Sequence, residues 1–437
     1  MTQASRKYFG TDGVRGPVGE LLTPDLAVKL GRAAALQAEA ERPQVLIVRD
    51  TRESGPMLEE ALASGVAAGG GDAMLGGVLP TPAASVLARR LSFDLAAVVS
   101  ASHNPFADNG IKFFNARGTK LDDDSELAIE ARLDEQTAER VGGVRTLEGA
   151  FDDYIRELRT AFQLDLSGLR VALDCANGAT HRAAPVVFGA LGADLVLTAV
   201  EPDGRNINAA CGSTHPETLV DLVKTSGADI GFAYDGDGDR VVAVDGTGRL
   251  HDGDDLIALI ATDLEDRGEL EGGVAVTVMT NFGFHKTMEA AGIEVAQTQV
   301  GDRYVIEVLQ ERDWRLGGEQ SGHIVWTDFT PTGDGIAASL LTLRALRGRR
   351  LEKVEPFERL PQMLENVRIA DRGAVEGAAA LWSAVEEENA KLTGRGRVLV
   401  RASGTEPLVR VMVEAPDEKE CEAICNRLVE IVQRELA

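Results

Sequence analysis

The same local pattern occurs three times in the chain, and this repetition is the feature that most constrains the fold. A short run rich in Val, Leu or Ala ends in a polar or glycine-containing turn at 43–52, at 168–178 and at 272–283. Helix-like stretches follow at 57–70 and 181–193. A strand, a turn, a helix and another strand are typical of α/β domains, in which helices cover mixed or parallel sheets. The pattern therefore predicts three related α/β domains.

The last part of the chain has a different pattern, with two strands around a short loop at 396–415 and a helical pattern at 418–436. This predicts a smaller α+β domain. Cys421 and Cys425 lie one helical turn apart, but no histidine or second cysteine pair is near them. We interpret them as packing residues rather than zinc ligands. Candidate joints divide the chain into domains at 1–152, 153–250, 251–365 and 366–437.

The charge of the chain restricts its partners. Lys and Arg number 45 against 70 Asp and Glu, a net charge of −25 over 437 residues. Such a chain is a poor general binder of nucleic acid or of an anionic membrane, so an anionic substrate needs a local cluster of Arg and Lys. The N-terminus lacks the apolar core of a signal peptide, and no apolar run of about 18 residues occurs. We therefore predict a cytoplasmic protein without a membrane span.

Three aspartates alternate with glycines directly after an apolar strand. Asp235, Asp237 and Asp239 repel one another at this spacing, and burial worsens the repulsion. A hard divalent cation with oxygen ligands relieves it, and the glycines let the backbone curl so that the carboxylates converge. The calcium loop of an EF-hand would need Gly and Glu where Arg240 and Gly246 stand. We predict a Mg²⁺ site, with an acidic surface turn as the alternative.

The sequence VVSASHNPF at 98–106 places a hydroxyl, an imidazole and an amide after a run of small apolar residues at 95–99. Ser, Asn and Pro favour turns for local backbone reasons, so an ordinary turn is one interpretation. A nucleophilic loop is the other.

The sequence RASGTEP at 401–407, followed by Arg410, offers hydroxyls, loop amides and two guanidinium groups to a phosphate. Its alternative is an ordinary hairpin turn. The absence of any Gly-Lys dipeptide excludes a nucleotide P-loop.

A fourth polar loop, LGGEQSGHIVW at 316–326, crowds a glutamate and a serine that suit adjacent hydroxyls of a sugar, although a plain polar loop is equally compatible. Arg15 lies in the glycine-rich sequence YFGTDGVRG, and Lys112 follows what we expect to be an Asn-Gly turn. Arg49 and Arg52 lie near the end of the strand expected in the segment 43–52. Each of these cations has an alternative interpretation as a surface charge.

A serine loop, an acidic loop, a polyol-type loop and a phosphate loop fall one in each proposed domain. Phosphoryl transfer needs a nucleophile or phosphate carrier, a metal that neutralises charge, and positioning groups. The combination therefore predicts an enzyme of phosphoryl transfer.

The sequences SASHNP, DGDGDR, GEQSGH and RASGTEP, in this order and spacing, resemble the four signature loops of the α-D-phosphohexomutase family. The resemblance covers essentially the whole chain. YFGTDGVRG, CGSTHPETL at 211–219 and Gln320 resemble the branch that acts on glucosamine phosphates. Ser100, where other branches often have Thr, and TNFGF at 280–284, where Asn-Leu-Gly is more usual, are departures. The implied fold is a four-domain, heart-shaped α/β protein, with three related mixed-sheet α/β domains and a smaller C-terminal α+β domain.

The resemblance implies the interconversion of glucosamine 6-phosphate and glucosamine 1-phosphate, a step toward UDP-N-acetylglucosamine and peptidoglycan precursors. Ser102 would carry a phosphate, pass it to the substrate and receive the other phosphate back from the 1,6-bisphosphate intermediate. One Mg²⁺ would be held by the Ser102 phosphate together with Asp235, Asp237 and Asp239. Glucosamine or glucose 1,6-bisphosphate would act as the activator.

The resemblance also implies roles for the remaining loop residues. His103 and Lys112 would be the general acid and base, in an order that stays open, with Arg240 and Arg15 as further catalytic cations. Glu319 and Ser321 would hold the sugar hydroxyls. The phosphate that is not reacting would be held by Arg401, Ser403, Gly404, Thr405 and Arg410. The implied partner is a small phosphosugar, with neither nucleic acid nor membrane, and a homodimer is a candidate assembly.

Three alternatives remain at this point. A phosphomannomutase or phosphoglucomutase of the same family would use the same mechanism and read the 2-position of the sugar differently. A Mg²⁺-dependent sugar phosphatase with Ser102 as nucleophile would release free phosphate and no isomer. A metal-binding scaffold, with Ser102 as a regulatory phosphosite, would convert no sugar phosphate at all.

Overall fold

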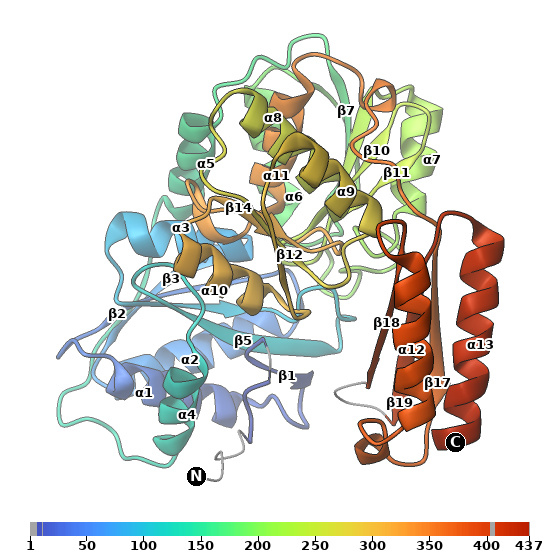
Figure 1. Cartoon of the computed structure of the whole chain (residues 1–437). Coiled ribbons are helices and arrows are strands. Elements are labelled where there is room, and N and C mark those ends of the chain that lie inside the picture. The colour runs from blue at the N-terminus through green and yellow to red at the C-terminus, as the bar shows by residue number, and fades with distance from the viewer. Residues whose placement is uncertain (1–6, 11, 403–406, 437) are drawn as a thin grey trace. The chain divides into compact units, whose positions relative to one another are not determined.

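The computed structural model describes residues 7–10, 12–402 and 407–436 and divides into two compact units (Figure 1). The first unit comprises Met1–Met279 and Glu294–Glu355, and the second comprises Thr280–Ile293 and Pro356–Ala437. Of the helices in the described residues, none is long and apolar enough to cross a membrane.

The first sheet of the first unit has six strands in the order β1-β5-β4-β2-β3-β6. Its strands are β1 (Val14–Pro17), β2 (Gln44–Arg49), β3 (Asp72–Val78), β4 (Leu95–Val99), β5 (Asp108–Asn115) and β6 (Val144–Thr146). Its helices are α1 (Pro24–Gln37), α2 (Gly55–Ala68), α3 (Thr81–Leu91) and α4 (Asp123–Ala131). Strand β4 is parallel to β2 and antiparallel to β5, and all five of its residues are buried. A strand buried on both faces fits its run of small apolar residues.

The second sheet has five strands in the order β11-β10-β9-β7-β8. Its elements are α5 (Ala150–Ala161), β7 (Arg170–Asp174), α6 (Thr180–Ala190), β8 (Asp194–Thr198), α7 (Glu217–Ser226), β9 (Ile230–Tyr234), β10 (Val241–Asp245) and β11 (Leu250–His251). Strands β7, β8 and β9 are parallel, and β10 returns antiparallel to β9. The tight connection between β9 and β10 is the acidic loop.

The third sheet has five strands in the order β13-β12-β14-β15-β16. Its elements are α8 (Gly253–Asp266), β12 (Val274–Thr277), β13 (Val295–Thr298), α10 (Asp302–Arg312), β14 (Leu316–Gly318), β15 (Ile324–Trp326), β16 (Thr330–Gly333), α11 (Gly335–Leu346) and the 3₁₀ helix η1 (Leu351–Lys353). Strands β14 and β15 form a hairpin whose connection is the GEQSGH sequence. The three mixed sheets confirm the predicted α/β architecture.

The second unit contains a three-stranded antiparallel sheet in the order β17-β19-β18. Its elements are α9 (Phe282–Ala291), β17 (Gln362–Arg368), the 3₁₀ helix η2 (Arg372–Ala374), α12 (Ala379–Leu392), β18 (Arg397–Ala402), β19 (Leu408–Glu414) and α13 (Glu418–Leu436). The smaller α+β domain is therefore confirmed. Cys421 and Cys425 are free thiols buried in its core, as expected of packing residues.

Two local features differ from the simplest reading of the sequence. Strand β5 runs unbroken through Asn109 and Gly110, so the expected Asn-Gly turn is wrong. Pairing with β1 on one side and β4 on the other overrides the local preference, and a Cβ on Gly110 would lie 2.4 Å from the carbonyl oxygen of Ser100. Helix α9 follows β12 in sequence but belongs to the second unit. The proposed domain boundaries stay predictions.

Candidate active site

The serine loop begins where β4 ends, and it brings Ser102 into the interior of the first unit. Ser102 is 1% exposed and has a backbone φ of +52°. Its hydroxyl donates a 2.5 Å hydrogen bond to Oδ2 of Asp235 and lies 3.5 Å from Nδ1 of His103. The serine predicted to carry phosphate therefore touches the acidic loop directly.

The acidic loop connects β9 to β10 and converges as the alternating glycines predict. Asp235, Asp237 and Asp239 are all buried, and one oxygen of each lies within 4.8 Å of the others. A Cβ on Gly236 would lie 2.5 Å from the carbonyl oxygen of Ser102. The glycine therefore permits the close approach of the two loops.

The three carboxylates fit a hard divalent cation. Oδ1 of Asp237 and Oδ1 of Asp239 are buried and accept no hydrogen bond from the residues that the structure describes, which is costly unless a ligand satisfies them. Burial raises the pKa of Asp235 well above its usual value, and the carboxylates of Asp239 and Asp237 raise it further. An all-oxygen donor set suits Mg²⁺, and bound Mg²⁺ would remove this repulsion.

Lys112 neutralises part of the charge of the acidic loop. Its ammonium lies 2.7 Å from Oδ2 of Asp237 and 3.6 Å from Oδ2 of Asp239, and it is 2% exposed. Burial alone would lower the pKa of Lys112, but Asp237, Asp12 and Asp239 raise it above its usual value. Lys112 is therefore a cation held against the carboxylates.

Arg240 lies close both to His103 and to the acidic loop. Nη1 of Arg240 is 3.4 Å from Nδ1 of His103, and Nε of Arg240 is 3.8 Å from Oδ1 of Asp239. Burial lowers the pKa of His103, and Arg240 and Arg15 lower it further. An imidazole of this kind is neutral at physiological pH and can accept a proton.

Arg15 belongs to the same site, but through a network that the sequence did not indicate. Arg15 pairs with Asp12, and Asp12 also accepts from the ammonium of Lys120 over 2.5 Å. Lys120 pairs in turn with Asp302, whose carboxylate lies 3.7 Å from Nε2 of His323. The two pairs that Lys120 makes span 108 and 182 positions of the chain, so no local pattern could reveal them.

His323 connects the GEQSGH loop to the acidic loop. Its Nδ1 lies 3.8 Å from Oδ2 of Asp239, while Nε2 accepts the N–H of Gly333 over 3.1 Å. No role for His323 is predicted from the sequence, although His323 lies in the same short loop as the two sugar-binding candidates. His323 is buried, and each nitrogen of its ring lies near a partner, so His323 is part of the site.

Glu319 and Ser321 occupy different environments in that loop. Glu319 is buried, and its Oε1 accepts the backbone N–H of Gly301 over 3.0 Å, whereas Ser321 is exposed. Gln320 donates to Oδ2 of Asp252, the N-cap of α8, over 3.2 Å. The loop is therefore anchored through Glu319 and Gln320 and leaves Ser321 open to a ligand.

The alternative interpretation of Arg52 as a surface cation is wrong. Its side chain is fully buried, and its guanidinium donates to the carbonyl oxygens of Ser102, Asn104, Pro105 and Asp108 in the serine loop. Fifty positions separate Arg52 from Ser102. A buried guanidinium bound to several carbonyls fixes the path of that loop.

The second unit contains the two arginines predicted to hold phosphate. Arg401 on β18 and Arg410 on β19 are directly opposite each other in the antiparallel pair. Burial lowers the pKa of Arg401, and the charge of Arg410 lowers it further. Two like charges opposite each other favour an anion between them. Ser403, Gly404 and Thr405 lie outside the described residues.

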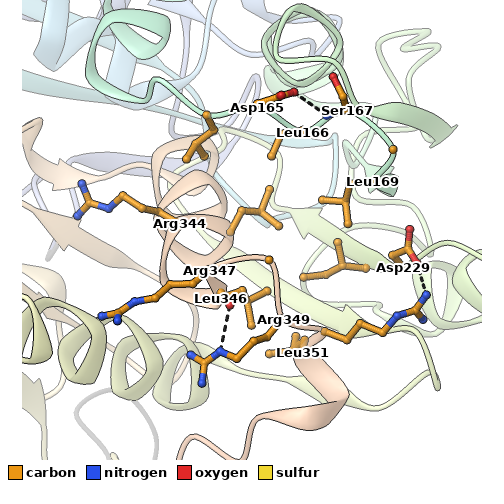
Figure 2. A pocket seen from close by; sticks show the side chains of 16 residues that line it. Asp165, Leu166, Ser167, Leu169, Asp229, Arg344, Leu346, Arg347, Arg349 and Leu351 are labelled. Carbon is orange, nitrogen blue, oxygen red and sulfur yellow. Dashed lines mark hydrogen bonds and ion pairs between the residues drawn. The ribbon is translucent and has the colours of Figure 1, made fainter.

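A separate cavity of about 440 Å³ lies in the first unit, away from these groups (Figure 2). Leucines such as Leu166, Leu169 and Leu346 line its centre, and Asp229 pairs with Arg350 at its edge. Of the predicted site residues that the structure describes, none lines it. This cavity is therefore separate from the candidate active site.

Comparisons with known proteins agree with this arrangement. Models of four phosphoglucomutase/phosphomannomutase domains match in order. They are alpha/beta/alpha domain I at 6–140, domain II at 152–248, domain III at 252–363, and the C-terminal domain at 364–431.

One relative, a phosphoglucosamine mutase of Pelotomaculum thermopropionicum, is 48% identical over 97% of this chain and 98% of its own length. A phosphoglucomutase/phosphomannomutase family protein of Burkholderia thailandensis has a solved structure that is 26% identical with a TM-score of 0.85. The match covers 98% of this chain and 97% of that one. The N-acetylphosphoglucosamine mutase of Aspergillus fumigatus, solved with GlcNAc-6P and magnesium, is 18% identical with a TM-score of 0.69, over 99% and 96% of the two chains. At that identity, it supports the fold alone.

Proposed function

The chain belongs to the phosphoglucomutase/phosphomannomutase family, and within it we propose a phosphoglucosamine mutase that interconverts glucosamine 6-phosphate and glucosamine 1-phosphate. The observation that carries the proposal is the 2.5 Å contact between the Ser102 hydroxyl and Asp235, inside a cluster of three buried carboxylates. The chain is 48% identical to a phosphoglucosamine mutase over nearly the full length of both chains, and this match supports glucosamine as the sugar.

In the proposed reaction, Ser102 carries a phosphoryl group on its side-chain oxygen. The free hydroxyl of the bound sugar phosphate attacks phosphorus, the bond to Ser102 breaks, and the sugar hydroxyl loses its proton. The resulting 1,6-bisphosphate reorients, and Ser102 takes the other phosphoryl group while the product hydroxyl regains a proton. Glucosamine or glucose 1,6-bisphosphate would restore a Ser102 that has lost its phosphate.

Asp235, Asp237 and Asp239 would hold one Mg²⁺, together with an oxygen of the Ser102 phosphate. When bound, Mg²⁺ supplies positive charge that stabilises the transferring phosphoryl group. Arg240, beside Asp239, adds a guanidinium on the same side, and Arg15 adds another. These local cations explain how a chain of charge −25 can accept a phosphorylated sugar.

His103 and Lys112 are the candidate groups that take and return the proton. His103 lies beside the Ser102 oxygen, and Lys112 lies between Asp237 and Asp239. The order of the two as acid and base stays open. Glu319 and Ser321 would bind the sugar hydroxyls, and Arg401 and Arg410, with Ser403, Gly404 and Thr405, would bind the phosphate that is not reacting. A cytoplasmic location and a homodimer also stay predictions.

The proposal is tested by comparing glucosamine 1-phosphate, glucose 1-phosphate and mannose 1-phosphate as substrates. The assay contains Mg²⁺ and a trace of the matching 1,6-bisphosphate, and it measures isomer and free phosphate together. We expect kcat/KM for the amino sugar to exceed the others by at least about tenfold, or about 1.4 kcal/mol. A preference for glucose or mannose would favour a phosphoglucomutase or phosphomannomutase. Free phosphate without isomer would favour the phosphatase.

A further inference from the structure

Ser102 has a backbone conformation that a serine adopts only at a cost. Its φ of +52° lies in the left-handed region, where a residue with a Cβ is strained. The Ser102 hydroxyl reaches Asp235 in this conformation. Groups around the loop must therefore hold the backbone there, because such strain persists only when the surroundings enforce it.

The amide side of Ser102 is held by another serine. The N–H of Ser102 donates to Oγ of Ser100 over 2.9 Å, and the hydroxyl of Ser100 donates to Oδ2 of Asp50 over 2.5 Å. Ser100 and Asp50 are almost completely buried. The Ser100 hydroxyl therefore has one acceptor and one donor within reach, and each fixes its orientation.

The carbonyl side of Ser102 is held by Arg52. Nη2 of Arg52 donates to the Ser102 carbonyl oxygen over 2.8 Å, and Nδ2 of Asn208 donates to the same oxygen over 2.9 Å. Nε of Arg52 donates to Oδ2 of Asp50 over 2.8 Å. Asp50 thus connects the group that holds the amide with the group that holds the carbonyl.

We propose that Asp50, Ser100 and Arg52 form a clamp that positions Ser102 for phosphoryl transfer by fixing both of its peptide groups. The three are positioning residues, since their contacts reach the substrate only through Ser102. The clamp rests on the proposed function. If the amide contact is lost, the backbone of Ser102 relaxes to negative φ, and its hydroxyl swings away from Asp235. Misplacement of a reacting atom by about 1 Å can cost about 100-fold in rate.

The test compares Ser100→Ala and Ser100→Thr in the full chain with Mg²⁺ and glucosamine 1-phosphate. Ser100→Ala removes the hydroxyl without adding bulk, and we expect kcat to fall about 100-fold with KM within about threefold. Ser100→Thr keeps a hydroxyl, and we expect it to retain kcat within about threefold of the wild type. Single-turnover transfer from phosphorylated Ser102 should show the same loss for Ser100→Ala.

Ser85→Ala is the matched control. Ser85 is also fully buried in the first unit, and its hydroxyl bonds Gly118 and Thr330, so this variant loses comparable contacts elsewhere. We expect it to lower the thermal midpoint while leaving kcat within about twofold. If Ser100→Ala does not fold, Arg52→Lys serves in its place, because lysine keeps the charge but cannot reach several carbonyls at once.

The outcomes separate the clamp from the proposed function. A wild-type kcat in Ser100→Ala would overturn the clamp, and so would an equal loss of kcat in Ser85→Ala. Either result would leave the isomerase activity of the wild type in place. A wild-type chain that forms no isomer would overturn the proposed function, and the clamp with it. A selective loss of kcat in Ser100→Ala, recovered in Ser100→Thr, would establish the clamp.

Discussion

The hydroxyl of Ser102 and the carboxylate of Asp235 are in hydrogen-bond contact, although 133 positions separate them in the chain. The contact forms because each residue lies just beyond the end of a buried strand, β4 or β9, in the same compact unit. Gly236 allows the backbones to meet. The Ser102 oxygen therefore lies beside three carboxylates that could hold a metal ion.

Replacing one carboxylate of the acidic loop should weaken the metal site without changing the fold. In Asp239→Asn, an anionic ligand becomes a neutral one, and we expect the Mg²⁺ concentration for half-maximal activity to rise at least about tenfold, or about 1.4 kcal/mol. Titration of EDTA-treated enzyme with Mg²⁺ measures this. Asp221→Asn, an equal charge change at an exposed position of α7, is the control. Equal Mg²⁺ dependence in the two variants would remove Asp239 from the site.

Loss of Lys112 should make the fold depend on Mg²⁺. The Lys112 ammonium pairs with buried Asp237 over 2.7 Å, and removing one partner of a buried pair typically costs about 3–5 kcal/mol. In Lys112→Met, we expect the thermal midpoint in EDTA to fall by several degrees and to recover largely with Mg²⁺. Differential scanning calorimetry with and without Mg²⁺ measures the recovery. A fall that Mg²⁺ does not reverse would mean that Lys112 stabilises the fold through packing instead.

The sequence predicts the loops of the site better than it predicts their supports. The alternating aspartates that begin at Asp235 predict a metal site by their own pattern. The local pattern around Ser102 leaves an ordinary turn open, and its role follows from the resemblance of the four loops to a known family. Arg52 and Lys120 act through partners in distant segments. Arg52 binds backbone carbonyls, which carry no sequence signal, and nothing beside Lys120 in the sequence indicates its partner Asp302. The Asn-Gly pair at 109–110 misleads for a related reason, since strand pairing on both sides overrides a local turn preference.

Asp334 should make the first unit less stable as the pH rises from about 4 to 6. Burial raises the pKa of Asp334 from 3.8 to about 6, even though it caps α11 and accepts the hydroxyl of Tyr154 over 2.8 Å. The folded state therefore binds the proton more tightly than the unfolded state does. The stability that the bound proton of Asp334 adds to the folded state is fully present below the pKa of the unfolded state. It is lost as the pH rises through the pKa of the folded state, by about 3 kcal/mol in all.

The difference in urea midpoint between the wild type and Asp334→Asn isolates this contribution. Asparagine keeps an acceptor for the N-cap and does not titrate. We expect the wild type to lose stability relative to the variant between pH 4 and pH 7, mostly below about pH 6. A constant difference over that range would show that the carboxyl of Asp334 titrates with the same pKa in the folded and unfolded states.

We expect Arg401 to lower the stability of the second unit and to raise its affinity for an anion. Arg401 and Arg410 face each other across β18 and β19, and like charges directly opposite each other destabilise a sheet. Arg401→Gln removes one charge and keeps most of the side-chain length. We expect the thermal stability of the second unit to stay equal or rise slightly, because repulsion from Arg410 is gone.

The same variant should bind glucosamine 1-phosphate more weakly, by about tenfold, because a charge-assisted hydrogen bond to phosphate contributes about 1.5–3 kcal/mol. Isothermal titration in Mg²⁺ measures the affinity, and the Mg²⁺ dependence of activity should stay that of the wild type. If the variant is more stable but binds glucosamine 1-phosphate more weakly, the arginine pair is an anion site that lowers the stability of the fold. Unchanged affinity would remove Arg401 from phosphate binding, and a large loss of stability would make it a structural cation.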